Sequence, residues 1–213
     1  LLPIYDKPLI FYPLSILMLA KIKDILIIVN KGQLEQYKKI LPNGKNLGIK
    51  ISYIEQDKPR GLPDAFVIGE KFIGKENVAM ILGDNFFYGQ ALSSYLEQIK
   101  LHKSGCLAFC YPVNNIENFK ILEKNKNLLK VIEKPKNSKS NLAVTGLYVF
   151  DENSISFVKK FKRSKRGEFE IIDILNNYAK KNLLKPIYLG RGASWYDMGT
   201  FEDFANVNQL VNI

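Results

Sequence analysis

Residues 78–89 read VAMILGDNFFYG, an apolar run that stops at Gly83 and is followed at once by the carboxylate of Asp84. A short continuous apolar run is typical of a strand that is buried on both faces of a parallel sheet. Open parallel sheets bind their ligands beyond the carboxyl ends of the strands. An acid in this place either caps the next element or holds a divalent metal ion such as Mg²⁺.

Similar runs alternate with segments of helical length along the first half of the chain. The expected strands are 24–29, 49–54, 77–82 and 106–113, and the expected helices are 8–22, 32–41, 62–73 and 91–103. This alternation predicts an α/β fold in three layers, with a mixed, mainly parallel sheet covered by helices on both faces.

The second half predicts a small antiparallel extension of that sheet. Segments 119–124 and 128–133 flank the tripeptide NKN and are expected to form a hairpin. The other expected elements are strands at 142–150 and 183–190 and helices at 151–161, 168–181 and from Thr200 onward. Since no linker or repeat interrupts the sequence, we expect one domain over residues 1–213.

Composition narrows the classes of function. The net charge of +10 favours anionic partners, but the lysines are scattered and do not cluster with arginines and aromatic residues as in nucleic-acid-binding proteins. No apolar stretch is long enough to span a membrane. Cys106, Cys110 and the single histidine His102 are too few for a zinc site, so we expect buried thiols and a reducing, cytoplasmic compartment.

A second carboxylate is placed like the first. Asp197 follows an expected strand and precedes the last helix, beside Gly199 and Thr200. The alternative is an ordinary helix start that Thr200 caps. Two acids at strand ends, each near a glycine, favour a magnesium site for phosphate chemistry.

Cationic side chains are expected beside such a site. In VIEKPK, Glu133 and Lys134 end a strand, and Lys134 can reach an anionic substrate as a point charge. Arg166 stands just before a helix start, where its guanidinium and nearby backbone N–H groups can hold a phosphate. The alternative for each is a solvated surface charge.

Six segments in a fixed order carry a resemblance to a known family. They are LLPIYDKPLIFYPLSILMLA, GLPDAFVIGE, LGDNFFYG, EKPKNSKSNLAVTGLYVFD, RGEFEI and GRGASWYDMGT. Together they resemble the sugar-nucleotide pyrophosphorylases, and within them the glucose-1-phosphate thymidylyltransferases. The resemblance implies a nucleotidyltransferase α/β/α sandwich, usually a homotetramer, that transfers dTMP from dTTP to glucose-1-phosphate with Mg²⁺. The dTDP-sugar product would feed the synthesis of surface polysaccharide.

The resemblance also implies roles for particular residues. Asp84 and Asp197 match the metal ligands, and Lys134 and Arg166 match residues that hold the sugar phosphate. The remaining positions that it implies are substrate-binding residues: Gln56, Gly61 and Leu62 for the base, Glu133, Glu168, Val144 and Tyr148 for the sugar, and Asn85.

The sequence departs from the family in three places. The family's first strand and its glycine-rich triphosphate loop have no counterpart in residues 1–213, so we expect a fragment of low activity with unpaired backbone on two neighbouring strands. Lys120 stands where the family has glycine, so the sequence leaves undecided which sugar is the substrate. Pro63 and Asp64 stand where the family commonly has alanine and glutamine, so the sequence leaves undecided which nucleotide base is bound.

Three other functions stay open on the sequence alone. The chain could be a non-catalytic or fragmentary module that binds a sugar nucleotide. It could be a pyrophosphorylase that uses UTP, CTP or another hexose-1-phosphate. The third alternative is a basic α/β domain that binds nucleic acid.

Overall fold

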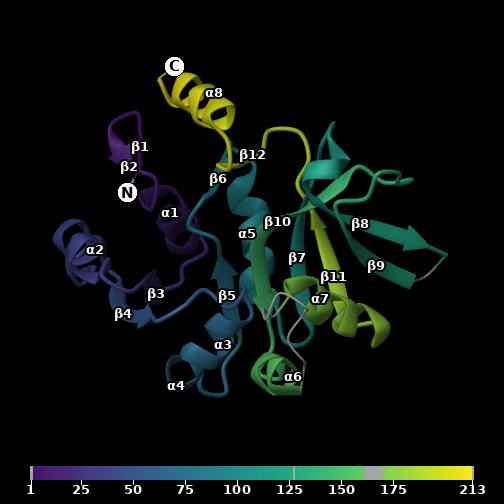
Figure 1. Cartoon of the computed structure of the whole chain (residues 1–213), viewed down its shortest axis with the longest axis horizontal. Coiled ribbons are helices and arrows are strands. Elements are labelled where there is room, and N and C mark those ends of the chain that lie inside the picture. Colours follow the sequence, from purple (N-terminus) through teal and green to yellow (C-terminus); the bar gives the residue numbers. More distant parts are fainter. Residues whose placement is uncertain (1, 127, 161–169, 213) are drawn as a thin grey trace.

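The computed structural model describes residues 2–126, 128–160 and 170–212 (Figure 1). Its strands are β1 (Pro3–Ile4), β2 (Lys7–Pro8), β3 (Asp24–Asn30), β4 (Lys50–Gln56), β5 (Val78–Ile81), β6 (Asn85–Tyr88), β7 (Cys106–Pro112), β8 (Lys120–Asn125), β9 (Leu128–Glu133), β10 (Leu142–Phe150), β11 (Leu184–Tyr188) and β12 (Ser194–Asp197). Its α-helices are α1 (Phe11–Leu19), α2 (Leu34–Ile40), α3 (Asp64–Ile68), α4 (Glu70–Ile73), α5 (Leu92–Leu101), α6 (Ser154–Lys160), α7 (Ile171–Lys180) and α8 (Phe201–Val211).

In the first part of the chain, β3 and β4 form a parallel pair that α1 covers. In β3 every second residue is buried, because β-strand side chains alternate between the two faces of a sheet. Ile25 and Ile27 pack against Leu14 and Leu17 of α1. Pro13 is tolerated in this helix because it lies in the first turn, where a backbone N–H has no partner within the helix.

The largest sheet is organised around β10. One edge of β10 pairs antiparallel with β7, and the other edge pairs antiparallel with β5 and β8 in turn. Strand β11 is parallel to β7, and β9 completes the expected hairpin with β8. Strands β5, β7 and β11 therefore share one direction, while β10 runs against them. The mixed α/β fold is as expected, but the strand from 142–150 separates β5 from β7 instead of extending the sheet at its edge.

Two other expectations need correction. The helix expected over 62–73 is two short helices, α3 and α4, that meet at Gly69. The strand expected to be buried on both faces, β5, has four apolar residues that are all only half-buried. The reason is that β5 pairs with β10 on one edge only, within the residues that the structure describes.

A small sheet that we did not expect lies directly after Asp84. Strands β6 and β12 pair antiparallel, with Asn85 opposite Asp197 and Phe87 opposite Trp195. Helix α8 follows β12, and Thr200 caps it by accepting a hydrogen bond from the N–H of Asp203 at 3.1 Å, as in the alternative interpretation of this segment. Figure 1 shows α8 beside β1 at the N-terminal end of the described chain.

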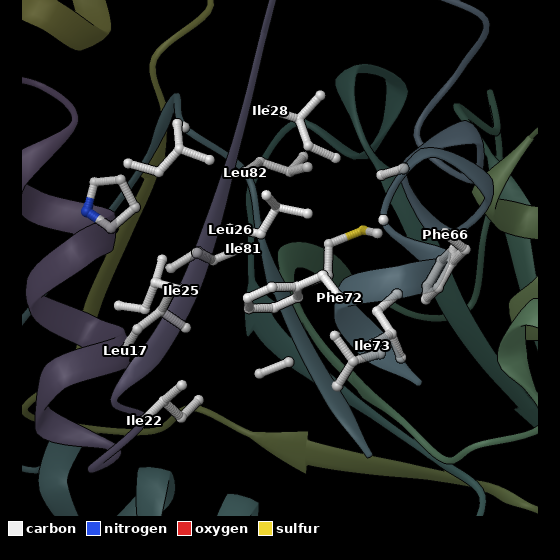
Figure 2. A pocket seen from close by; sticks show the side chains of 18 of the residues that line it. Leu17, Ile22, Ile25, Leu26, Ile28, Phe66, Phe72, Ile73, Ile81 and Leu82 are labelled. Carbon is white, nitrogen blue, oxygen red and sulfur yellow. The ribbon is translucent and has the colours of Figure 1, made fainter. Parts of the chain in front are cut away.

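The pair β3–β4 forms a sheet of its own, separate from β5 in the described part of the chain. An apolar cavity lies between β3 and β5, as Figure 2 shows. None of the described helices is long and apolar enough to cross a membrane.

Candidate active site

The backbone brings the two candidate metal ligands together. Asp84 lies in the turn between β5 and β6, and Asp197 is the last residue of β12. Asp197 stands opposite Asn85 in the β6–β12 pair, and the N–H of Met198 donates to the carbonyl oxygen of Asp84 at 2.9 Å. Two acids that lie 113 positions apart in the sequence (197 − 84) are thus neighbours at the carboxyl end of β5.

The electrostatics of Asp197 reflect this crowding of negative charge. Burial raises the pKa of Asp197 above its ordinary value, and the nearby charge of Asp84 raises it further. The ammonium groups of Lys120 and Lys134 act in the opposite direction. A cation placed between Asp84 and Asp197 would relieve the repulsion between the two carboxylates.

Asn85 organises the polar atoms around Asp84. Its side-chain oxygen accepts two hydrogen bonds at 2.7 Å, from the N–H of Gly146 and from Nε1 of Trp195. Its Nδ2 donates to Oδ1 of Asp84 at 3.0 Å. Because Asn85 is buried and uses both ends of its amide, the contacts make it a positioning residue for Asp84.

The two lysines reach the site on the β8–β9 hairpin. Strand β5 ends where Leu82 donates its N–H to the carbonyl of Gly146, and β8 begins beside Ala143 of the same β10 edge. Lys120 opens β8 opposite Glu133, with Nζ 3.9 Å from Oε2 of Glu133. The end of the hairpin that carries Lys120, Glu133 and Lys134 therefore lies next to the end of β5.

Lys134 has an unusual backbone conformation. Its φ of +40° lies in the left-handed region, which is uncommon for a residue with a side chain. Its N–H donates to the carbonyl oxygen of Phe119 at 3.0 Å, which helps to hold the turn. Strained backbone of this kind is frequent at functional sites.

Val144 and Tyr148 lie beneath the site on β10. Both are buried, and the β7–β10 register shifts between them, next to Gly146. Burial is the main cause that raises the pKa of Tyr148, and the charges of Asp197 and Glu133 contribute. Bulges are common next to active sites because they redirect the strand locally.

The residues expected to read the base line the cavity between β3 and β5. Gln56 ends β4, and its Nε2 donates to Oδ1 of Asn30 at 2.9 Å. Gly61 has a φ of +92°, which favours glycine, and Leu62 follows it. Gly83, the residue before Asp84, lines the same cavity, so this region borders the two acids.

Comparison with known proteins places this geometry in a family. The family model described as nucleotidyl transferase matches residues 1–212.

The chain belongs to the nucleotidyl transferase family.

Individual relatives of the chain are similar over nearly its whole length. A glucose-1-phosphate thymidylyltransferase from Neisseria meningitidis is 47% identical over 99% of this chain and 74% of that protein. One from Mycolicibacterium smegmatis is 39% identical over the same shares. These matches confirm the resemblance to the thymidylyltransferases of this family.

A solved structure supports the fold. A protein from Bacillus anthracis assigned as a glucose-1-phosphate thymidylyltransferase, in complex with sucrose, has a TM-score of 0.89 and 33% identity. That match covers 99% of this chain and 85% of the other. UDP-glucose pyrophosphorylase complexed with UDP-glucose has a TM-score of 0.83 over 99% of this chain and 89% of the other. At 24% identity it supports the fold alone.

The donor set in this nucleotidyl transferase fits a magnesium ion. The described residues hold no cluster of three or more His, Cys, Asp or Glu side chains. Mg²⁺ needs no such cluster, because it usually takes one or two carboxylates and fills its other positions with water and substrate phosphates. The adjacent Asp84 and Asp197, which repel each other in the absence of a cation, meet that requirement.

Two predicted site residues cannot be compared with the structure. Two other residues contact the site although no pattern in the sequence pointed to them. Arg166 and Glu168 fall outside the described residues. Gly146 and Trp195 were not predicted, because their part depends on hydrogen bonds to Asn85 from strands far apart in the sequence. For Gly146 the close approach is also steric: a Cβ there would lie 2.6 Å from the side chain of Asn85.

Proposed function

We propose that this chain transfers dTMP from dTTP to glucose-1-phosphate, giving dTDP-glucose and pyrophosphate. The observation that carries the proposal is the pairing of Asp197 with Asn85, which sets Asp84 and Asp197 side by side with Lys120 and Lys134 near them. Thymidylyltransferases at 39–47% identity support the choice of substrates.

The reaction depends on neutralising the negative charges of the two substrates, and it does not need covalent catalysis by a protein nucleophile. An oxygen of the sugar phosphate attacks the α-phosphorus of dTTP, a new P–O bond forms, and the bond to the β-phosphate oxygen breaks. Asp84 and Asp197 would hold Mg²⁺, which when bound offsets the negative charge of the phosphate oxygens. The role of the protein is to bring two anions together in line, so no protein nucleophile is required.

The other residues would bind and orient the two substrates. Lys134 and Arg166 would hold the sugar phosphate, since a cation there offsets repulsion between the reactants. Asn85 would fix the carboxylate of Asp84. The remaining proposed contacts are Glu133, Glu168, Val144 and Tyr148 toward the sugar, and Gln56, Gly61 and Leu62 toward the base.

The proposal also includes a cellular compartment, an oligomeric state and a use for the product. We place the chain in the cytoplasm as one nucleotidyl transferase domain of a homo-oligomer, in the family's usual form a homotetramer. Its dTDP-sugar product would supply polysaccharide synthesis. The second candidate function is binding of a sugar nucleotide without turnover, which Lys120 favours because it stands where the family has glycine.

A pyrophosphate-release assay tests the proposal. The chain is assayed with dTTP, UTP or CTP and several hexose-1-phosphates, beside Asp84→Asn and, as matched control, Asp57→Asn, whose side chain is 82% exposed. We expect the highest rate with dTTP and glucose-1-phosphate, a loss of about a hundredfold or more in Asp84→Asn, and none in Asp57→Asn. Absence of turnover with every pair, together with calorimetric binding of dTDP-glucose, would favour the non-catalytic candidate.

A further inference from the structure

Strand β10 contains a bulge where it pairs with β7. Residues 145–147 lie between two regular pairs, Val144 with Cys110 and Tyr148 with Ala108. Only one residue of β7 stands opposite these positions of β10, so the backbone ladder is interrupted there. The interruption leaves backbone groups on both strands in need of other partners.

The hydroxyl of Thr145 supplies those partners. Its Oγ1 donates to the carbonyl oxygen of Phe109, the β7 residue opposite the bulge, at 2.9 Å. The same oxygen accepts a hydrogen bond from the N–H of Leu147 at 3.3 Å. Because Thr145 is only 1% exposed, water cannot easily replace its hydroxyl as the partner of these two backbone groups.

The bulge presents the backbone of Gly146 to the candidate metal site. The N–H of Gly146 donates to Oδ1 of Asn85 at 2.7 Å, and its carbonyl oxygen accepts from the N–H of Leu82 at 2.9 Å. This edge of β10 lies between the part that pairs with β5 and the part that pairs with β8. A small displacement of the bulge would therefore move the acceptor site of Asn85 relative to the end of β5.

A continuous path of hydrogen bonds joins Thr145 to Asp84. Thr145 holds the backbone on both sides of Gly146, and Gly146 binds Oδ1 of Asn85. Asn85 in turn donates from Nδ2 to Oδ1 of Asp84 at 3.0 Å. Thr145, Gly146 and Asn85 are all buried, and a close-packed interior transmits the displacement of one residue to the next.

Two other buried hydroxyls serve as matched controls. Tyr178 donates to Oδ1 of Asp151 at 2.7 Å, and Ser154 has a hydroxyl without a partner in the described part of the chain. Both lie at the opposite end of β10, because Asp151 follows β10 and accepts at its carbonyl oxygen from the N–H of Ser154 at 3.1 Å. Removing either hydroxyl leaves the bulge intact.

We propose that Thr145 is a positioning residue for the metal site. Its hydroxyl holds the β10 bulge, and through Gly146 and Asn85 the bulge sets the position of the Asp84 carboxylate. Metal affinity then depends on Thr145, although its hydroxyl is buried and bonded to backbone. The rate of nucleotidyl transfer depends on it as well, a consequence that rests on the proposed function.

The single tryptophan of the chain reports the position of Asn85 without metal or substrate. Nε1 of Trp195 donates at 2.7 Å to the same Oδ1 of Asn85 that binds Gly146. The indole N–H resonance is compared in Thr145→Val, which removes the hydroxyl and keeps a branched side chain, and in Thr145→Ser, which keeps the hydroxyl. We expect the resonance to shift in Thr145→Val and to keep its position in Thr145→Ser.

Binding of Mn²⁺ by the same variants tests the effect on the metal site. Thr145→Val should weaken Mn²⁺ binding about tenfold or more, as is typical when a residue that orients a metal ligand is lost. Thr145→Ser should restore the affinity. Tyr178→Phe and Ser154→Ala should change neither the Mn²⁺ affinity nor the indole resonance, even where the melting temperature falls.

Three results would overturn the proposal. The first is a Thr145→Val protein that melts at a lower temperature but keeps its indole resonance and its Mn²⁺ affinity, because the hydroxyl would then support the fold alone. The second is an equal loss of Mn²⁺ affinity in Tyr178→Phe, which would indicate general destabilisation. The third is an unaltered chain that binds no Mn²⁺.

If Thr145→Val does not fold, hydrogen exchange of the unaltered chain supplies the test. Coupling between two sites is reciprocal, so Mg²⁺ should slow exchange of the Gly146 and Leu147 amides about fivefold or more. The amide of Val149, beyond the bulge on β10, is the internal control for a general effect on stability. Exchange at Gly146 and Leu147 that Mg²⁺ slows no more than at Val149 would overturn the proposal.

These outcomes can be told apart from those for the proposed function. A chain that releases no pyrophosphate with any substrate pair, but shows the expected effects of Thr145→Val on the indole resonance and on Mn²⁺ binding, contradicts the function alone. A Thr145→Val protein that releases pyrophosphate at the full rate and binds Mn²⁺ like the unaltered chain contradicts the positioning role alone.

Discussion

Met198 donates its backbone N–H to the carbonyl oxygen of Asp84 at 2.9 Å, so the residue after one candidate metal ligand is bonded to the other. This contact extends the β6–β12 pairing by one step and fixes the separation of Asp84 and Asp197 through backbone. A pair of ligands held in this way is preorganised, and it can bind a cation without a large conformational change.

Replacing Asn85 by alanine should affect both stability and the metal site. The change leaves the buried N–H of Gly146 and Nε1 of Trp195 without an acceptor, and each unsatisfied group costs about 1–3 kcal/mol. We expect a fall in melting temperature and weaker Mn²⁺ binding, measured by thermal denaturation and by metal titration. Trp195→Phe, which removes only one donor, should cost less. The positioning role would be contradicted by Asn85→Ala that binds Mn²⁺ like the unaltered chain.

Replacing Asp197 by asparagine should stabilise the fold without metal. Because folding raises the pKa of Asp197 above its ordinary 3.8, the folded chain binds this proton more tightly than the unfolded chain. The resulting stability is present below the ordinary pKa and is lost as the pH rises through the raised pKa. In EDTA, Asp197→Asn should therefore melt at a higher temperature near pH 7, and the gain should shrink toward pH 3.8. A gain that does not depend on pH would point to another cause.

Lys120 should contribute to binding of the sugar phosphate. Its Nζ lies 3.9 Å from Oε2 of Glu133, and its positive charge lowers the pKa of Asp197. The ammonium group is thus close enough to the two acids to turn from Glu133 toward an incoming phosphate. Hydrogen bonds to charged groups contribute about 1.5–3 kcal/mol, so Lys120→Met should raise the KM for glucose-1-phosphate about tenfold or more and spare the KM for dTTP. Lys124→Met, on the exposed end of β8, is the matched control for steady-state kinetics. Equal effects of the two changes would contradict this role.

The two cysteines should be unreactive in the folded chain. Cys106 and Cys110 are buried on β7, and burial raises the pKa of Cys110 to about 12 and that of Cys106 well above its ordinary value. A thiol reacts through its thiolate, so a disulfide reagent at pH 8 should label neither until denaturant is added, when both react. Rapid labelling of either thiol in the native chain would show that β7 is accessible.

Much of the fold could be predicted because the signal was local. The apolar run of β3, the hairpin β8–β9 and the Thr200 cap depend on neighbours in sequence, and each was found within a few residues. The place of β10 between β5 and β7 depends on contacts far along the chain. Hydrophobic patterning shows that a segment is a strand but not which strand it joins.

The arrangement of the candidate site could be predicted only in part, for the same reason. Asp84 and Asp197 carry a local signal, an acid at the end of an apolar run near a glycine. The strands that join them, β6 and β12, have four residues each, and NFFY in particular has no alternation that separates a strand from a turn. The link from Asn85 to Gly146 and Trp195 depends entirely on that long-range pairing.

Binding of Mn²⁺, used in place of Mg²⁺, tests most directly whether Asp84 and Asp197 share one cation. Electron paramagnetic resonance of free Mn²⁺ gives the number of sites and their affinity in the unaltered chain, in Asp84→Asn, in Asp197→Asn and in the Asp57→Asn control. We predict one site per chain that each of the two single changes weakens at least tenfold and that the control retains. Full Mn²⁺ affinity in either Asp84→Asn or Asp197→Asn would contradict a shared site.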